Sequence, residues 1–180
     1  MRLHSLAVEQ FRNFPAKQLS FEADARGVLI CGTNGIGKTN LLEAIHFLLK
    51  GRTHRTLRSR DVIRHGEGQA SAALTLVSDH QLTHQLVLRI RKSGKKEHKL
   101  DEKAVPPRAQ LVRRFPLVSF FPADLQSLYG NPVLRRDLLD GAMAVVDQYV
   151  HTWKRYQSVL KARNALLKQD TAQQAAELLE

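Results

Sequence analysis

The pattern G-x-x-x-x-G-K-[ST] is matched at every fixed position by Gly32-Thr33-Asn34-Gly35-Ile36-Gly37-Lys38-Thr39. Glycines let a loop wrap so closely around an anion that backbone N–H groups point at phosphate oxygens. Lys38 can reach the β- and γ-phosphates of a nucleotide, and the Thr39 hydroxyl can ligate Mg²⁺. The helix expected after the loop presents its positive end to the same anion. The stretch therefore predicts a nucleotide phosphate-binding loop (P-loop).

The flanking residues give the motif the context that it requires. Gly27 to Cys31 is a compact apolar run, which predicts a buried strand ending in a small buried cysteine. From Thr39 to Lys50 the apolar residues recur at helical spacing, and Gly51 provides a C-terminal stop. A strand–loop–helix unit favours a nucleotide site over the alternative, a glycine-rich turn with an incidental lysine.

Other motifs indicate which nucleotide the loop binds and whether the chain can hydrolyse it. ATP is favoured because the chain has no Asn-Lys-x-Asp guanine motif. Hydrolysis normally needs an apolar strand that ends in Asp and holds Mg²⁺ and water. Ala142 to Asp147 superficially fits, but it lies in a helical pattern and is interpreted as a helix segment. We expect ATP and Mg²⁺ as cofactors, and no complete set of catalytic residues in this chain.

Composition limits the class of protein. The 180 residues include 28 Lys and Arg against 17 Asp and Glu, a net charge of +11, and 43% are hydrophobic. This is too much apolar side chain for a disordered tail, and the positive charge favours nucleic acid as a partner. No apolar run approaches the roughly 18 residues of a membrane-spanning helix, and no signal-peptide core is present. With a single cysteine, the chain is expected in the cytoplasm.

Periodicity predicts an α/β protein with α+β character. Short strands at 3–8 and 18–21 flank a turn at 13–15, and an antiparallel β-meander follows at 70–77, 82–90, 97–100 and 103–105. A short helix at 111–114 and an apolar strand at 117–121 come next. Asn131-Pro132 predicts a helix start, and apolar spacing from Val146 predicts a long helix. The spacing alone leaves open whether that helix packs on another helix or on a globular core.

Two segments concentrate the positive charge. The arginine segment, residues 51–65, holds five arginines against Asp61: Arg52, Arg55, Arg58, Arg60 and Arg64. Phosphate contact is favoured for it, either to nucleic acid or to nucleotide. The lysine hairpin, residues 89–103, holds seven basic residues against three acidic ones. For the hairpin, nucleic-acid contact and a solvated edge that discourages strand pairing are equally good interpretations.

Several stretches resemble the RecF family and its SMC-like ATPase relatives. The opening Leu6-Ala7-Val8-Glu9-Gln10-Phe11-Arg12-Asn13-Phe14 resembles the start of these proteins, and residues 32–45 resemble their P-loop and following helix. The similarity continues through 51–65, through 122–140 with Arg135-Arg136-Asp137, and through 156–168. It implies an ABC-type ATPase head, here a partial one over 1–121, and the start of a helical arm over 122–180.

The resemblance also implies an activity and partners. RecF-type proteins are cytoplasmic, DNA-dependent ATPases that dimerise on ATP and bind single-stranded, gapped and double-stranded DNA. With RecR and RecO they help load RecA recombinase during DNA repair, recombination, replication restart and the SOS response. By the same resemblance, Arg12, Asn13 and Asn40 are expected near the nucleotide, although Arg12 and Asn13 also suit a simple strand-to-turn connection.

This chain departs from the family pattern in one respect. The returning helix, the signature motif and the acidic Mg²⁺ strand of RecF-type proteins are absent from it. The chain is therefore expected to be inactive as an ATPase alone. Two alternatives remain open from the residues: a P-loop kinase for a small molecule, and a non-hydrolytic module that binds DNA or protein.

Overall fold

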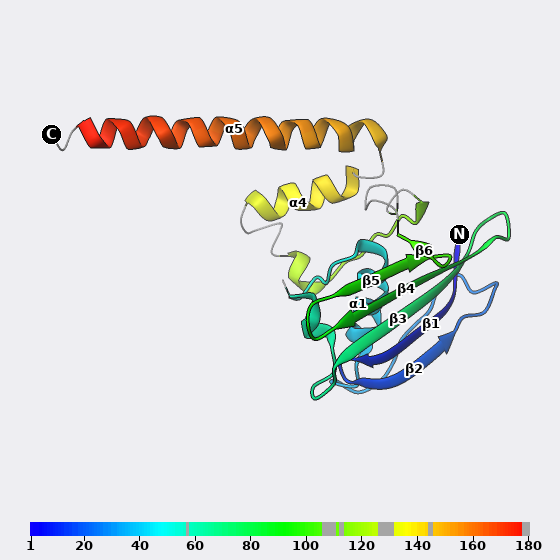
Figure 1. The fold of residues 1–180 in the computed structure, drawn as a ribbon. Coiled ribbons are helices and arrows are strands. Elements are labelled where there is room, and N and C mark those ends of the chain that lie inside the picture. The colour runs from blue at the N-terminus through cyan, green and yellow to red at the C-terminus, as the bar shows by residue number, and fades with distance from the viewer. Residues whose placement is uncertain (57, 106–110, 112–113, 126–131, 144–145, 178–180) are drawn as a thin grey trace. The chain divides into compact units, whose positions relative to one another are not determined.

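The computed structural model describes residues 1–56, 58–105, 111, 114–125, 132–143 and 146–177 (Figure 1). The chain divides into two compact units, residues 1–119 and 120–180. No helix within the described ranges is long and apolar enough to cross a membrane.

Unit 1 is built on one antiparallel sheet of six strands in the order β2-β1-β3-β4-β5-β6 (Figure 1). The strands are β1 (Arg2–Phe11), β2 (Phe14–Ser20), β3 (Gln69–Val77), β4 (Thr83–Arg91), β5 (Lys96–Leu100) and β6 (Lys103–Ala104). The predicted strand pair at the N-terminus and the predicted β-meander are confirmed. Together with the helices, the sheet gives the α+β fold that the sequence indicated.

One face of the sheet and one face of a helix form the core. Alternate residues of the central strands are buried, such as Leu74 on β3 and Leu88 on β4. Helix α1 (Lys38–Lys50) adds Ala44, Phe47 and Leu48, all with 0% exposure, to the same cluster. The period of two in the strands and of 3.6 in the helix bring these apolar side chains onto facing surfaces.

The C-terminal end of α1 is held by a glycine and by the lysine hairpin. Gly51 adopts a left-handed conformation at φ +68°, and its N–H donates to the Phe47 carbonyl over 2.9 Å. The Lys96 ammonium donates to the Gly51 carbonyl over 2.8 Å and lies 4.9 Å from the centre of the Phe47 ring. His98 is hydrogen-bonded to the backbone of Leu48. The predicted helix and its stop are confirmed, and part of the hairpin's positive charge serves α1.

The N-terminal half of α1 is tied to the β1–β2 turn by a buried ion pair. Glu43 is fully buried, and both of its carboxylate oxygens accept from Arg12: Nε donates over 2.9 Å and Nη2 over 2.6 Å. The third nitrogen of Arg12, Nη1, donates to the Asp61 carbonyl over 2.7 Å. Arg12 thereby connects the turn, the helix and the arginine segment. Such bidentate, charge-assisted bonds fix geometry as well as charge.

Two predicted strands are wrong. Residues 27–31 and 117–121 belong to no strand or helix. Leu29 is 87% exposed and Val118 is 97% exposed, and Cys31, expected to be buried, is exposed. An apolar run becomes a buried strand only where neighbouring strands take up its backbone hydrogen bonds. Among the described residues, the sheet ends at β2 and β6, so neither run has such a neighbour.

Unit 2 contains a 3₁₀ turn and two helices. They are η2 (Pro122–Leu125), α4 (Pro132–Met143) and α5 (Asp147–Glu177). Helix α4 begins at Pro132, as predicted, whereas the expected cap Asn131 lies outside the described residues. Asp140 on α4 accepts hydrogen bonds from Tyr149 and, over 2.8 Å, from Trp153 Nε1, which joins the two helices.

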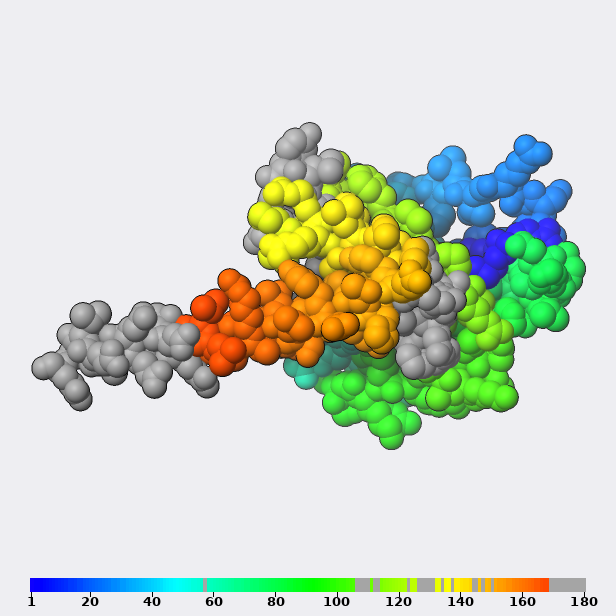
Figure 2. All heavy atoms as spheres, turned by 90° about the horizontal axis from the view of Figure 1, so that it is seen from above, coloured from blue at the N-terminus to red at the C-terminus, as the bar shows by residue number. Residues whose placement is uncertain are grey.

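The long helix predicted from the apolar spacing is confirmed as α5. It begins at Asp147. Of the run 142–147, Ala142 and Met143 end α4 and Asp147 begins α5, whereas residues 144 and 145 lie outside the described part. Tyr156 is 55% exposed and Val159 is 61% exposed. Figure 2 shows side chains of the coloured part of α5 at the surface.

We predict that Glu43→Gln destabilises unit 1 by about 3 kcal/mol, because breaking a buried ion pair leaves the other charge without its partner. The matched control is Glu97→Gln, which removes an equal charge from a surface pair with Lys99 and should change stability far less. Urea unfolding monitored by circular dichroism measures both free energies. Equal losses in the two variants contradict this role of Glu43.

A second prediction concerns pH. Burial lowers the pKa of His98 below its ordinary value of 6.5, the Leu48 hydrogen bond opposes this shift, and Lys96 adds to it. At a pH between the lowered pKa of His98 in the folded chain and its ordinary pKa in the unfolded chain, the unfolded chain binds more protons. The neutral His98 side chain therefore contributes its full stabilisation above about pH 6.5, and this contribution is lost as the pH falls through the lowered pKa. Urea unfolding measures the free energy of unfolding at about pH 7.5 and 5.5. Between these two pH values it should fall less in His98→Gln than in the wild type. An equal fall in both proteins would show that His98 does not cause the pH dependence.

Candidate phosphate-binding site

The loop between residues 32 and 37 needs glycine at its end for two reasons. Gly37 has φ +109°, a conformation that side chains rarely adopt. A Cβ atom at Gly37 would lie 2.5 Å from the Phe14 ring and 2.6 Å from the Asn13 amide oxygen. The loop therefore approaches the β1–β2 turn as closely as backbone atoms allow.

The start of α1 has the properties of an anion site. Gly37 is the N-cap residue, no side chain caps the helix, and its first turn carries no acidic residue. The first N–H groups of a helix have no partner within the helix and carry the positive end of its dipole. A phosphate group at this position would receive those hydrogen bonds.

The motif ends with Lys38 and Thr39, whose ammonium and hydroxyl groups are the ones expected to contact phosphate and Mg²⁺. Both residues lie in the first turn of α1. The Lys38 ammonium donates to the carbonyls of Gly32, over 2.7 Å, and Thr33, over 3.0 Å. It therefore reaches back across the loop, where it can meet a phosphate oxygen. Thr39 is half-buried beside it. The described residues contain no cluster of His, Cys, Asp or Glu that could hold a metal ion. The role of Thr39 as a Mg²⁺ ligand stays a prediction from the motif.

Two of the three predicted neighbours of the nucleotide, Asn13 and Asn40, are linked to this loop by hydrogen bonds. Asn13 Nδ2 donates to the Ile36 carbonyl over 2.9 Å. Asn40 Nδ2 donates to Asn13 Oδ1 over 2.8 Å. The guanidinium of Arg12 is occupied by Glu43 and by the Asp61 carbonyl, as described above. Contact of these residues with a nucleotide remains a prediction, but the structure does bring Asn13 and Asn40 to the loop.

The arginine segment divides into separate environments. Arg55 lies at α1, where Nη1 donates to Asn40 Oδ1 over 2.9 Å and lies 3.7 Å from Glu43 Oε2. Arg64 pairs with Glu67 at 3.9 Å. Arg52, Arg58 and Arg60 are exposed, the last on the 3₁₀ turn η1 (Ser59–Val62). Only Arg55 of the five has a hydrogen bond with the residues around the P-loop among the contacts of the described chain.

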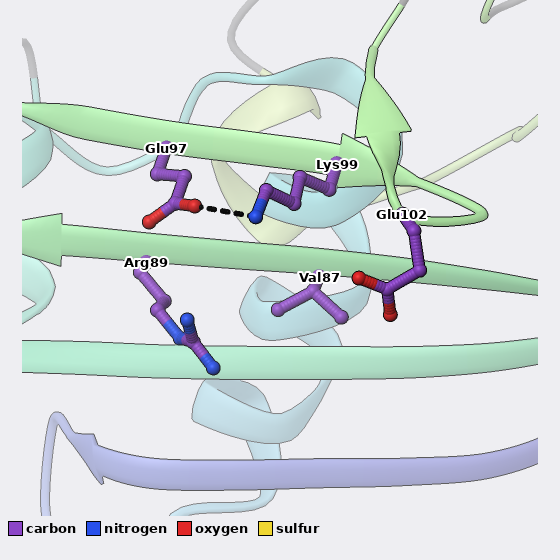
Figure 3. A pocket seen from close by; sticks show the side chains of 5 residues that line it. All are labelled: Val87, Arg89, Glu97, Lys99 and Glu102. Carbon is purple, nitrogen blue, oxygen red and sulfur yellow. Dashed lines mark ion pairs between the residues drawn. The ribbon is translucent and has the colours of Figure 1, made fainter.

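The lysine hairpin forms a small surface pocket on the sheet, lined by Val87, Arg89, Glu97, Lys99 and Glu102 (Figure 3). Glu97 and Lys99 pair at 2.8 Å. Their hydrogen bond lowers the pKa of Glu97 and raises that of Lys99, so both stay charged. This arrangement of self-paired charges fits the solvated-edge interpretation of that part of the hairpin.

Sequence reasoning missed Glu43 as a residue of this region. Its signal was a charged side chain between the buried residues Leu41 and Ala44 of α1. A carboxylate at such a position needs a buried cation. The resemblance had already singled out Arg12, 31 residues away, but nothing in the sequence pairs the two.

The chain is similar in sequence to known proteins. Residues 2–125 match the family described as RecF/RecN/SMC N terminal domain. The DNA replication and repair protein RecF of Synechococcus sp. (strain JA-2-3B'a(2-13)) is 36% identical over 173 residues, which cover 96% of this chain and 45% of that protein. RecF of Symbiobacterium thermophilum is 38% identical over 170 residues, which cover 94% of this chain and 44% of that protein. The chain thus spans less than half the length of these curated relatives.

Solved structures agree. A structure of the recombination mediator protein RecF with ATP, in the RecFOR pathway, superposes with a TM-score of 0.77 at 30% identity and covers 93% of this chain and 44% of that one. A structure from work on ATP-driven dimerisation of SMC ATPases, at 19% identity and a TM-score of 0.60, covers 78% of this chain and 98% of that one and shows the shared fold. The matched family, which spans more than half of the chain, and this fold lead to one conclusion: the chain belongs to the RecF/RecN/SMC N-terminal domain family.

Proposed function

We propose that this chain is the nucleotide-binding, N-terminal part of a RecF-type DNA-repair ATPase. The observation that carries the proposal is the loop at 32–39, in which glycines, Lys38 and an uncapped helix start surround one position for an anion. The relatives reported above, which match the chain over nearly its whole length, are RecF proteins, and the similar solved structure of RecF is that of RecF with ATP.

In this proposal each part of the site has one task. Residues 32–38 bind the phosphates through backbone N–H groups and the Lys38 ammonium. Thr39 ligates Mg²⁺, which neutralises phosphate charge when it is bound. Asn13 and Asn40 support the loop from its side, and Arg12 holds the β1–β2 turn that carries Asn13.

The proposal also explains the two unpaired apolar runs. In a head of complete RecF length, further strands would pair with residues 27–31 and 117–121 and cover Leu29 and Val118, which are exposed in this chain. The acidic Mg²⁺ strand and the signature motif would come from that same part. Residues 1–121 then form a partial ABC-type head, and residues 122–180 begin the helical arm.

DNA contact is assigned in this proposal to the arginine segment. Arg52, Arg58 and Arg60 are exposed and have no acidic partner among the ion pairs of the described chain. Arginines of this kind bind phosphate oxygens without reading sequence. The finer roles belong to the complete protein: ATP-dependent dimerisation, action with RecR and RecO in RecA loading, recombination and the SOS response, and a place in the cytoplasm.

We predict that this chain binds ATP weakly at most and does not hydrolyse it, whereas a version extended to the length of its relatives binds ATP with Mg²⁺. In both versions Lys38→Ala should remove the binding that the wild type shows, because the ammonium is the loop's one side-chain cation. Lys17→Ala, which removes an exposed lysine from β2, is the control. Equilibrium titration with ATP and a steady-state phosphate-release assay measure both. Unchanged ATP affinity in Lys38→Ala rules out this site.

DNA binding should depend steeply on salt, because each phosphate contact releases counterions. We expect Arg60→Gln to weaken binding of a gapped duplex and to reduce the slope of log affinity against log salt by about one. Lys17→Gln removes the same charge from β2 and should leave the slope unchanged. Fluorescence anisotropy at a series of salt concentrations tests this. A flat salt response in the wild type removes the phosphate-contact role of the arginine segment.

A further inference from the structure

The peptide between Ile36 and Gly37 is oriented by a side chain from outside the loop. Asn13 Nδ2, in the β1–β2 turn, donates to the Ile36 carbonyl over 2.9 Å. This peptide is trans. In a trans peptide the C=O and the N–H point in opposite directions. The bond from Asn13 therefore turns the Gly37 N–H toward the opposite side of the loop, away from the β1–β2 turn.

Asn13 is itself held by a directed series of hydrogen bonds. Arg55 Nη1 donates to Asn40 Oδ1 over 2.9 Å, and Asn40 Nδ2 donates to Asn13 Oδ1 over 2.8 Å. Each amide thus accepts on its oxygen and donates from its nitrogen, which defines the direction in which the Asn13 amide faces. Asn13 cannot rotate its amide without breaking both of its bonds.

The base of this series is rigid. The residue before Asn13 is Arg12, which binds the buried carboxylate of Glu43 with two nitrogens. Arg55 at the other end lies 3.7 Å from the same carboxylate. The turn also leaves no free space at the loop, since a Cβ atom on Gly37 would lie 2.6 Å and 2.8 Å from the Asn13 amide atoms. One buried carboxylate therefore holds Arg55, where the series begins, and Arg12, the chain neighbour of Asn13.

We propose that Asn13 is a positioning residue of the P-loop: it sets the direction of the Gly37 N–H so that this group donates to the polyphosphate of a bound nucleotide. The inference rests on the proposed function of the loop as a nucleotide site. Asn13 acts through the Ile36 carbonyl and does not contact the ligand. Asn40 acts in the same way through Asn13, and the Arg12–Glu43 pair keeps the turn in place.

This role predicts which part of a nucleotide depends on Asn13. A residue that orients the loop affects every ligand with the same phosphates, whether or not a nucleoside is attached. A residue that contacts the ribose or the base affects only the complete nucleotide. Inorganic triphosphate and ATP, each with Mg²⁺, are therefore the two probes that separate these cases.

The test is Asn13→Ala, a neutral change, in the chain extended to the length of its relatives. We expect affinity for ATP and for inorganic triphosphate to fall by the same factor, about fivefold to tenfold, which is the value of one hydrogen bond. Asn164→Ala, on the exposed face of α5, is the matched control and should change neither affinity. A loss for ATP alone overturns the proposal, because it shows direct contact with the nucleoside.

Coupling between the two asparagines gives a second readout. If Asn40 acts through Asn13, the affinities of Asn13→Ala and of the double variant Asn13→Ala, Asn40→Ala should agree within about twofold, because the second change removes a bond that is already lost. If the double variant loses as much affinity as the two single variants together, Asn40 does not act through Asn13, and the proposed series from Asn40 to Ile36 is wrong.

A third readout needs no nucleotide and separates this inference from the proposed function. In the 180-residue chain, Asn13→Ala should shift the amide resonance of Gly37 and speed hydrogen exchange across residues 34–38, with little change in overall stability. If these signals change but the extended wild type binds neither probe, the proposed function is wrong and the positioning of the loop stands. If the signals stay unchanged, the positioning role is wrong whatever the chain binds.

Discussion

The buried ion pair between Arg12 and Glu43 is the contact on which the site in unit 1 depends. A carboxylate with no exposure is stable only beside a cation with good geometry, and Arg12 supplies it through two nitrogens. Glu43 follows Thr39 by four residues, so it lies on the same side of α1 as the end of the P-loop motif. The pair therefore fixes the start of α1, the β1–β2 turn and the nearby arginine segment with respect to one another.

The positive charge that first indicated nucleic acid has several separate tasks. Lys96 serves the C-terminal end of α1, where burial lowers its pKa. Lys99 is paired with Glu97 on the sheet surface. Arg12 and Arg55 surround Glu43. Exposed arginines such as Arg58 and Arg60 have no acidic partner among the ion pairs of the described chain, so they are the residues of this segment to which the proposed DNA contact is assigned.

Local patterns predicted the elements whose partners are close in sequence. The spacing from Thr39 to Lys50 and the stop at Gly51 gave α1, and alternation gave the β-meander, because adjacent strands pair with each other. The strand predictions for residues 27–31 and 117–121 were wrong. An apolar run is buried as a strand only where other strands pair with it, and a local sequence pattern gives no information on those strands. The P-loop was recognisable from its motif, but its support from Asn13 and Glu43 depends on contacts between distant segments.

We propose that the loop at 32–39 binds a polyphosphate in the position that these contacts create. A titration of the isotope-labelled chain with inorganic triphosphate and Mg²⁺, followed through the backbone amide resonances, tests this binding most directly and detects weak affinity. We expect the largest shifts at Gly35, Gly37, Lys38 and Thr39. Largest shifts within residues 52–64, with the loop unaffected, would contradict it.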